Sequence, residues 1–137
     1  MNLILSLLLA NQHAECITDN AQTVNTRMET YYDPADLKKF GQIGDFQKEL
    51  ADKFFSYYGS VFAEGALTAR EKSLIALAVA HTVQCAYCID AYTNDTLEKG
   101  CTEEQMMEAV HVAAAIRSGS TLVHSVQMMN KVKQVSM

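Results

Sequence analysis

The chain has 137 residues, of which 49% are hydrophobic and 20% are charged, and its formal net charge is −5. This length and apolar content favour a single domain with a substantial core. An acidic chain without a cluster of lysine and arginine argues against binding to nucleic acid or to an anionic membrane surface. The four cysteines do not form the dense pattern of a secreted disulfide scaffold. These cysteines are Cys16, Cys85, Cys88 and Cys101, and we expect a cytoplasmic protein in which the single C-x-x-C pair, Cys85 and Cys88, is catalytic or metal-binding.

The first ten residues form an apolar stretch that is too short to span a bilayer and lacks the basic start of a signal peptide. Residues 11–30 are polar and show no helical periodicity, whereas the segment after Met28 reads as the start of a domain. We expect residues 1–30 to be a poorly ordered extension, or the product of an upstream start codon, with a weak export signal as the alternative. Residues 31–137 are expected to form the folded domain, without a transmembrane helix.

Two helices are predicted in the first half of the chain. Asp33 and Pro34 indicate a short helix that ends near Gly41, because aspartate caps a helix N-terminus and proline fits the first helical position. Asp45 is expected to open a second helix, which ends at Gly65. Apolar and aromatic residues recur along it at three- and four-residue steps, which is typical of a core stripe or a subunit interface; these residues are Phe46, Leu50, Phe54, Tyr57, Tyr58, Val61 and Phe62.

The sequence predicts four more helices in the second half of the chain. Thr68 and Glu71 form a predicted capping box, followed by a helix that is apolar on almost every side and is expected to be buried on several of them. This helix ends near Gln84, and the next one carries the cysteine pair and stops at Gly100.

A second capping box, Thr102 and Gln105, starts a helix that we expect to break at Ser118 and Gly119, before a last helix that begins near Ser120. No stretch alternates between polar and apolar residues as a strand does. The sequence therefore predicts an all-α fold, a bundle of about five to six helices.

Cys85 and Cys88 form a C-x-x-C motif at the start of a predicted helix, so the two thiols lie one turn apart. That spacing suits a disulfide that opens and closes, and the helix N-terminus favours a reactive thiolate. Three interpretations compete: a redox dithiol, half of a zinc site, and two incidental core cysteines. The polar neighbours Gln84 and Asp90 argue against the last, because they indicate a partly open site.

Zinc usually takes four ligands, often from a second C-x-x-C motif or a closely spaced histidine pair. The remaining candidates, His81, His111, His124 and Cys101, have no such spacing. We therefore expect no metal, and the sequence indicates no flavin or haem. A thioredoxin fold is also excluded, because no strand pattern flanks the motif. The sequence favours a redox dithiol on a helical scaffold.

This combination resembles the carboxymuconolactone decarboxylase superfamily, in its alkylhydroperoxidase D-like (AhpD-like) branch. The resemblance rests on residues 70–80 (REKSLIALAVA) and 85–92 (CAYCIDAY), continues through Gly100 and covers about residues 67–129. Residues 28–34 and 63–68 are similar to a narrower group, the peroxidase-like proteins associated with arsenosugar biosynthesis. The resemblance implies a helical subunit that assembles into trimers or hexamers.

The resemblance also implies a peroxiredoxin-type oxidoreductase that reduces hydroperoxides and is reduced by an external dithiol. In the AhpD pattern the second cysteine attacks the peroxide and the first resolves it, which assigns these roles to Cys88 and Cys85. The family's proton relay places a glutamate and a histidine where this chain has Ser73 and Tyr92. Neither is a good base near pH 7, since serine does not titrate and tyrosine has a pKa near roughly 10. We therefore expect either that other residues replace the proton relay or that peroxide reduction is weak.

Three residues are candidates for rebuilding the relay. His81 precedes Cys85 by four residues and shares its face if the helix continues, so an imidazole–thiol pair is one hypothesis and a helix-end histidine is the other. Glu71 is a second candidate base, although its main role is expected to be in the capping box. Tyr92 is a candidate hydrogen-bond donor to a bound peroxide, or a packing residue. Apolar walls from Leu77, Val79 and Ile89 favour an organic hydroperoxide.

Three other functions are compatible with the motif. The departures at Ser73 and Tyr92 favour a dithiol–disulfide oxidoreductase that performs no peroxide chemistry. A thiol-based redox sensor or arsenical binder is the non-enzymatic alternative, since two close thiols suit a trivalent arsenical. Decarboxylation of a lactone is disfavoured, because the resemblance places a C-x-x-C motif in the redox branch.

Overall fold

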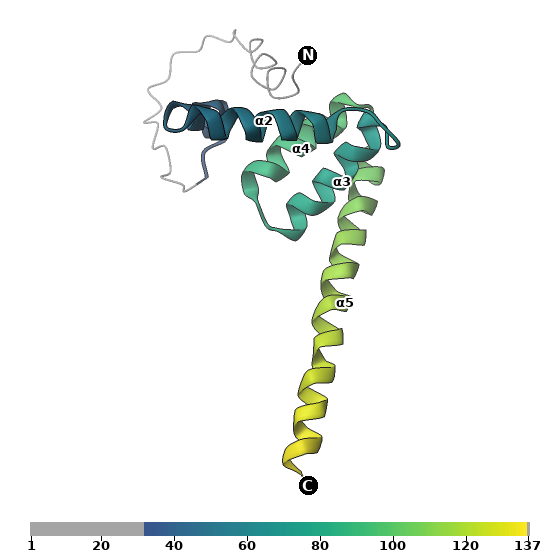
Figure 1. Ribbon diagram of the computed structural model, residues 1–137. Coiled ribbons are helices and arrows are strands. Elements are labelled where there is room, and N and C mark those ends of the chain that lie inside the picture. The colour runs from purple at the N-terminus through teal and green to yellow at the C-terminus, as the bar shows by residue number, and fades with distance from the viewer. Residues whose placement is uncertain (1–31, 137) are drawn as a thin grey trace, which may run out of the picture. The chain divides into compact units, whose positions relative to one another are not determined.

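A computed structural model describes residues 32–136, and within this range every element of regular secondary structure is a helix (Figure 1). Five elements follow one another: the 3₁₀-helix η1 (Pro34–Asp45), α2 (Lys48–Phe62), α3 (Ala69–Thr82), α4 (Ala86–Glu98) and α5 (Glu103–Val135). The predicted all-α fold is confirmed. The chain divides after Glu64 into two compact units, which are described separately below. The predicted extension, Cys16 and Met28 lie outside the described residues.

The first unit contains η1 and α2. The Asp33 side chain accepts a hydrogen bond of 3.0 Å from the Ala35 backbone N–H, and Pro34 occupies the first position, so this predicted cap is confirmed. The helix does not end near Gly41 but continues to Asp45. The expectation that Asp45 opens the next helix is wrong, because α2 begins only after Gln47, whose φ of −147° lies outside the helical region.

The aromatic residues of the first unit are only partly packed. Phe40 of η1 meets Phe54 and Phe55 of α2 edge-on, with ring centroids 6.0 and 5.5 Å apart, and Tyr58 and Phe62 lie at 4.8 Å. Other members of the predicted stripe are exposed within this unit. The most exposed is Phe46, with 89% of its surface accessible. The stripe therefore splits into an aromatic cluster and a set of residues without a core role in this unit.

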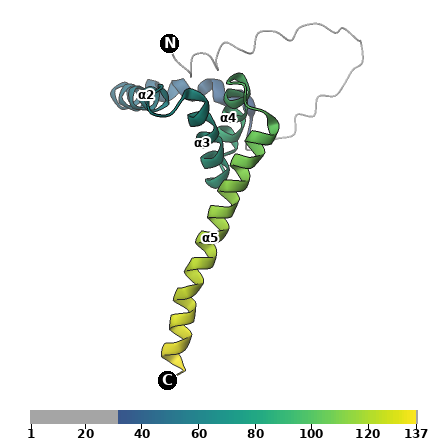
Figure 2. The ribbon, with the colours of Figure 1, turned by 90° about the vertical axis from the view of Figure 1, so that its right-hand side faces the viewer.

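The second unit is built on a hairpin of α3 and α4, with the first half of α5 packed against α3 (Figures 1 and 2). Both predicted capping boxes are present, at Thr68 with Glu71 and at Thr102 with Gln105. The core of this unit is small and consists of short side chains around one leucine: Ser73, Leu77, Ala80, Asp95, Thr96, Cys101 and Ala113. Because α3 is buried only along this line, Ile75 and Val79 stay about half exposed, and the expected burial on several sides is not found in this unit.

The turn between α3 and α4 is a Schellman motif. The Cys85 backbone N–H donates to the Ala80 carbonyl at 3.1 Å, and the Gln84 N–H donates to the His81 carbonyl at 3.2 Å. Gln84 has a φ of +57°, a left-handed conformation that glycine adopts far more readily. The chain therefore reverses over three residues, and the start of α4 is fixed directly against the end of α3.

The turn between α4 and α5 repeats this arrangement with glycine in the left-handed position. Gly100 has a φ of +73°, its N–H donates to the Leu97 carbonyl at 2.9 Å, and the Cys101 N–H donates to the Thr96 carbonyl at 3.2 Å. Cys101 is buried just after this glycine. A buried residue commonly accompanies this motif, which gives Cys101 a structural role.

Helix α5 is continuous over 33 residues, so the predicted break at Ser118 and Gly119 is wrong. A glycine inside a helix costs only about 1 kcal/mol relative to alanine, and a helix that is already nucleated propagates through such a position. The part of α5 after Gly119 extends beyond α3 and α4 (Figures 1 and 2). No helix within residues 32–136 combines the length and hydropathy needed to cross a bilayer.

Gln84 provides a test of the α3–α4 turn. Gln84→Gly should raise the free energy of unfolding by up to about 1 kcal/mol, because glycine tolerates the left-handed backbone. Gln84→Val should lower it by about 1–2 kcal/mol, because a β-branched residue does not. Chemical denaturation of the oxidised protein measures both effects. Gln127→Val, at an exposed position of α5, is the matched control; equal stabilities for the two Gln84 variants would contradict the turn geometry.

Candidate active site

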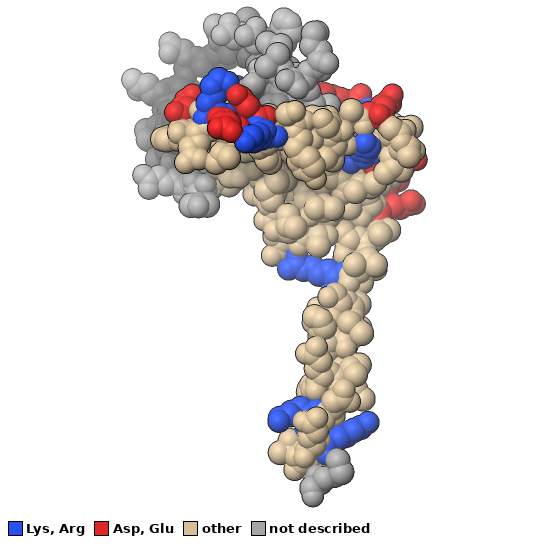
Figure 3. Space-filling view, viewed as in Figure 1, with Lys and Arg blue, Asp and Glu red and all other residues tan. Residues whose placement is uncertain are grey.

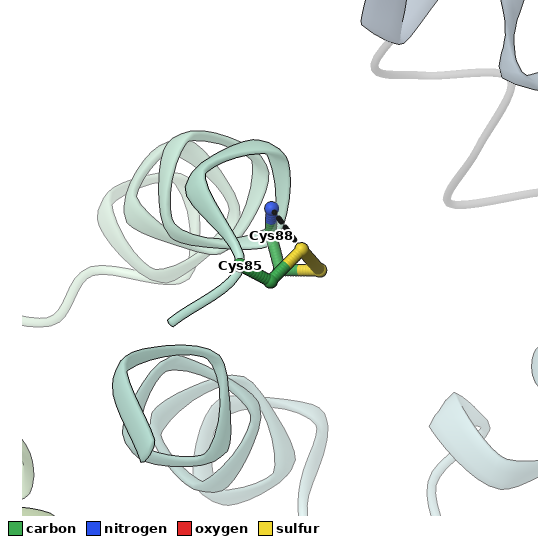
Figure 4. Close-up of a disulfide and its surroundings, with 2 residues drawn as sticks. All are labelled: Cys85 and Cys88. Carbon is green, nitrogen blue, oxygen red and sulfur yellow. Dashed lines mark hydrogen bonds between the residues drawn. A yellow bond between two sulfur atoms is a disulfide. The ribbon is translucent and has the colours of Figure 1, made fainter. Parts of the chain in front are cut away.

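Cys85 and Cys88 are joined by a disulfide at the start of α4, with their Cα atoms 5.2 Å apart (Figure 4). Both residues are half-buried. Cys85 is the N-cap residue of the helix, with φ −89° and ψ 100°, and Cys88 lies in the first turn. The pair is thus held at the helix terminus with access to solvent.

The sulfur of Cys85 acts as the helix cap. The Cys88 backbone N–H donates a hydrogen bond of 3.2 Å to Cys85 Sγ, which is the dashed line in Figure 4. Serine, threonine and aspartate normally provide this acceptor, and here a sulfur takes the position. The first turn of α4 contains no acidic residue. The positive end of the helix dipole is therefore available to stabilise a thiolate on Cys85 when the disulfide is reduced.

His81 lies in the last turn of α3, close in sequence to the dithiol but not on its helix. α3 ends at Thr82 and Gln84 reverses the chain, so His81 and Cys85 do not share a helix face. The imidazole Nδ1 lies 2.9 Å from the Leu77 carbonyl oxygen. A carbonyl oxygen only accepts, so Nδ1 carries the hydrogen and Nε2 of the neutral ring is the atom that can accept a proton.

Ser73 and Tyr92 occupy different environments. Ser73 is fully buried and its hydroxyl donates to the Arg70 carbonyl at 2.7 Å, so it has a structural role in α3. Tyr92 is half-buried on α4, one turn after Cys88. The structure thus leaves Tyr92, but not Ser73, on the helix that carries the dithiol.

Glu71 lies at the opposite end of α3 from the dithiol. Thr68 donates to its carboxylate from the backbone N–H at 2.7 Å and from the hydroxyl at 2.8 Å. These bonds hold the pKa of Glu71 below its usual range. Glu71 and Thr82 are eleven residues apart, so about 16 Å of helix separates this cap from the turn before Cys85. Glu71 is engaged in capping, far from the sulfurs.

The remaining sequence candidates are spread over the unit. Leu77 is only 1% exposed and belongs to the core, so it lines no open wall, whereas Val79 is 53% exposed and Ile89 is half-buried. His111 and His124 are exposed on α5. Within residues 32–136, no group of three or more histidine, cysteine, aspartate or glutamate residues is arranged to hold a metal ion.

Two residues of this unit were not identified from the sequence. Arg117 of α5 donates to the Thr82 carbonyl at 2.5 Å, which ties α5 to the end of α3 three residues before Cys85. Asp95 of α4 is buried and pairs with Lys99. The sequence carried a signal for the second, since Asp95 follows Cys88 by seven residues and Lys99 follows Asp95 by four, which places all three on one face of α4.

Comparison with known proteins identifies relatives of this chain, two of which are described here. An uncharacterized protein, protein 4 in the cox locus of Paracoccus denitrificans, is 46% identical over 76 residues, which are 56% of this chain and 68% of that protein. The crystal structure of a protein from Methanobacterium thermoautotrophicum is 36% identical, with a TM-score of 0.61, and the match covers 63% of this chain and 97% of that chain.

The family assignment extends over most of the described residues. Residues 48–131, which include α2, α3, α4 and nearly all of α5, match the carboxymuconolactone decarboxylase family. This range contains the disulfide and both Schellman turns, and it confirms the superfamily inferred from the sequence. The chain therefore belongs to the carboxymuconolactone decarboxylase family.

Proposed function

We propose that the protein is an AhpD-like thiol peroxidase that reduces hydroperoxides through a dithiol–disulfide cycle of Cys85 and Cys88. One observation carries this proposal: the two sulfurs form a disulfide at the N-terminus of α4, where a backbone N–H already donates to Cys85 Sγ. A helix terminus stabilises the anion that forms each time the disulfide opens. Such a disulfide suits a cycle better than a permanent crosslink.

The oxidative half of the cycle begins at Cys88, the attacking residue that the AhpD resemblance implies. The Cys88 thiolate attacks the peroxide, an S–O bond forms and the O–O bond breaks. Sulfur is oxidised to the sulfenic acid and the peroxide is reduced to an alcohol, whose oxygen takes up a proton. Cys85 then attacks the Cys88 sulfur, the S–S bond forms, and hydroxide leaves as water with the Cys85 proton.

The reductive half requires an external dithiol. Thiol–disulfide exchange is faster when the leaving sulfur is the more stable thiolate. Cys85 has the hydrogen bond from the Cys88 N–H and the helix terminus, so Cys85 is the better leaving group. The external thiolate therefore attacks Cys88, and the mixed disulfide forms on that residue.

His81 is the proposed base that deprotonates the dithiol. His81 presents Nε2 as the acceptor, because Nδ1 is bound to the Leu77 carbonyl. Tyr92 follows Cys88 by one helical turn, and we propose it as the hydrogen-bond donor to a bound peroxide. The exposed Val79 and the half-buried Ile89 favour an organic hydroperoxide over a small polar oxidant.

A second candidate function is disulfide exchange without peroxide chemistry. Buried Ser73, whose hydroxyl donates to a backbone carbonyl, favours it, because this position provides neither acid nor base. In this case the external thiolate attacks the Cys85–Cys88 disulfide in the same way as in the reductive half of the cycle, and no sulfenic acid forms.

We also propose that the protein is a homo-oligomer, a trimer or hexamer as the resemblance implies. Residues 118–130 of α5 contain no acidic residue, lysine or arginine, and Figure 3 shows the protruding part of α5 with charges only toward its end. Leu122, Val123 and Val126 are 68%, 61% and 48% exposed. Burying one such side chain contributes about 1.5–3 kcal/mol, so a second copy of this helix would stabilise the exposed surface.

The relative thiol pKa values of Cys85 and Cys88 test the capping role of Cys85. In the reduced Cys88→Ser variant, absorbance near 240 nm should show the Cys85 thiolate forming well below the ordinary thiol pKa of about 8.5. In Cys85→Ser, the Cys88 thiolate should form at higher pH, because Cys88 does not occupy the cap position. The double variant supplies the baseline for the other two thiols, and the opposite order would contradict the role of Cys85.

Peroxide turnover tests the proposed activity directly. With a dithiol such as dihydrolipoamide, cumene hydroperoxide should be consumed faster than hydrogen peroxide. Cys85→Ser and Cys88→Ser should each lose at least about 100-fold in rate, because neither variant can close the cycle. Cys101→Ser is the matched control and should retain activity. Rapid insulin disulfide exchange without peroxide consumption would select the second candidate function instead.

The exposed face of α5 tests assembly. Replacing Leu122 and Val126 by glutamate should convert the oligomer into smaller species in sedimentation velocity, because two new charges cannot be buried at an apolar contact. The control Ser120→Glu with His124→Glu introduces the same two side chains at exposed positions on the opposite side of the same helix. A wild type that sediments as a monomer would rule out the assembly.

A further inference from the structure

The C-terminus of α3 lies directly before the dithiol, and its carbonyl groups are satisfied in two different ways. A helix leaves its last four carbonyl oxygens without partners inside the helix. In α3, the carbonyls of Val79, Ala80 and His81 accept from backbone N–H groups of the following turn, at 2.9, 3.1 and 3.2 Å. The fourth carbonyl, that of Thr82, accepts from a side chain of α5 instead.

This donor is Arg117, whose Nη1 lies 2.5 Å from the Thr82 carbonyl oxygen. The guanidinium group is a permanent cation, and a hydrogen bond from a charged donor is stronger than one between neutral groups. Arg117 follows Ala113 by one helical turn, and Ala113 is the residue of α5 that is buried in the core of this unit. The packing of α5 on α3 therefore places a positive charge at the last carbonyl of α3.

Two helix dipoles of opposite sign meet at Cys85. Its N–H is bonded to the Ala80 carbonyl at the end of α3, and its Sγ caps the start of α4. A helix C-terminus carries a partial negative charge and a helix N-terminus a partial positive one. The two helices have 14 and 13 residues, so the two terminal charges are similar in size. The start of α4 therefore attracts a Cys85 thiolate, whereas the end of α3 repels it.

We infer that Arg117 is a positioning residue of the dithiol, because its charge offsets the negative end of α3 and leaves the start of α4 free to stabilise the Cys85 thiolate. Arg117 acts through the helix end and not by contact with sulfur or peroxide. This inference rests on the proposed thiol chemistry of Cys85 and Cys88, and it adds a residue of α5 to it.

The charge matters in the step that opens the disulfide. The external thiolate forms an S–S bond with Cys88, and the Cys85–Cys88 bond breaks with its electron pair on Cys85. A leaving sulfur departs faster when its thiolate is more stable. The disulfide is reduced by the external dithiol, which is itself oxidised when its second thiol releases Cys88. Arg117 therefore favours reduction of the disulfide without taking part in a covalent step.

The charge of Arg117 lies within range of this sulfur. Thr82 and Cys85 are three residues apart, so their Cα atoms are separated by at most about 11 Å. The turn shortens this path, because it brings the Cys85 N–H back to within 3.1 Å of the Ala80 carbonyl. At physiological ionic strength charges are screened over about 8 Å. Since Arg117 is exposed, we expect a moderate effect that salt weakens.

Other charged groups on α3 and α5 lie farther from the junction, with one exception. On α3 the charged residues occupy positions 70–72, at least about 15 Å of helix from Thr82. On α5 the nearest acid along the helix is Glu108, about 14 Å before Arg117. The exception is His81 in the last turn of α3, whose Nδ1 is bound to the Leu77 carbonyl.

The charged residues of α4 are compensated within that helix. Asp90 is half-buried and accepts from Asn94 at 3.4 Å. Asp95 is buried and paired with Lys99. These groups and His81 are the same in every variant below, so a difference between variants reports on Arg117.

The test is the pKa of the Cys85 thiol in the reduced Cys88→Ser protein, followed by absorbance near 240 nm without peroxide. Arg117→Gln keeps an N–H donor for the Thr82 carbonyl but removes the charge. It should raise this pKa by about half a unit, because a single charge at a helix terminus has an effect of this size. The thiolate fraction then falls about threefold at any pH well below the midpoint. The double variant without Cys85 and Cys88 supplies the baseline.

Two further variants separate charge from packing. Arg117→Lys keeps the charge and should leave the pKa of the Cys85 thiol unchanged. Arg70→Gln is the matched control, because Arg70 also joins α3 to α5, by donating to Gln105, but about 18 Å of helix away from Thr82. This control should leave the pKa unchanged even if it lowers the melting temperature.

Three results would overturn the inference. If Arg117→Gln lowers the melting temperature but leaves the pKa of the Cys85 thiol unchanged, Arg117 only joins the two helices. If Arg117→Lys raises the pKa by half a unit, the charge is not the cause, and this result counts even if Arg117→Gln does not fold. If Arg70→Gln raises the pKa equally, the effect is not local. Because no peroxide is present, all three results are independent of whether the protein reduces peroxides.

Discussion

The site depends on the backbone of Cys85, which belongs to two helix termini at once. Its N–H closes the Schellman turn of α3 through the Ala80 carbonyl, and its Sγ caps α4 by accepting from the Cys88 N–H. Each bond satisfies a backbone group that a helix end otherwise leaves unpaired. The backbone of Cys85 therefore cannot move without loosening both helix ends, and the sulfur cannot move without loosening the cap of α4. A reactive group fixed in this way needs little reorganisation between its oxidised and reduced states.

The same cap gives the disulfide its chemical character. A thiolate is a much stronger acceptor than a disulfide sulfur, so the Cys88 N–H and the end of α4 stabilise the reduced state more than the oxidised one. Opening the bond is favoured to that extent, which is what a cycling dithiol requires. The second Schellman turn shows the contrast, because its cysteine, Cys101, is buried and Thr102 does the capping, so that thiol remains structural.

The sequence predicts a feature well when the residues that determine it are close together along the chain. The capping boxes at Thr68 and Thr102 are local, and both were predicted. The break at Gly119 was wrong because a helix already formed tolerates a glycine. The left-handed Gln84 was not anticipated, because local preference favours glycine there and only the packing of two helices enforces it. For the site, the sequence identified the dithiol, but not the burial of Asp95, which depends on how α3 lies over α4.

Asp95 is buried next to a polar layer between α3 and α4 that includes Ser73. Ser73 and Thr96 are fully buried and joined across the two helices, so this level of the hairpin is polar but neutral on the α3 side. On the α4 side this layer contains Asp95, which is buried and paired with the partly exposed Lys99. A buried charge needs such a partner, because its desolvation would otherwise destabilise the folded state. The spacing of Cys88, Asp95 and Lys99 places this ion pair on the same face of α4 as the disulfide.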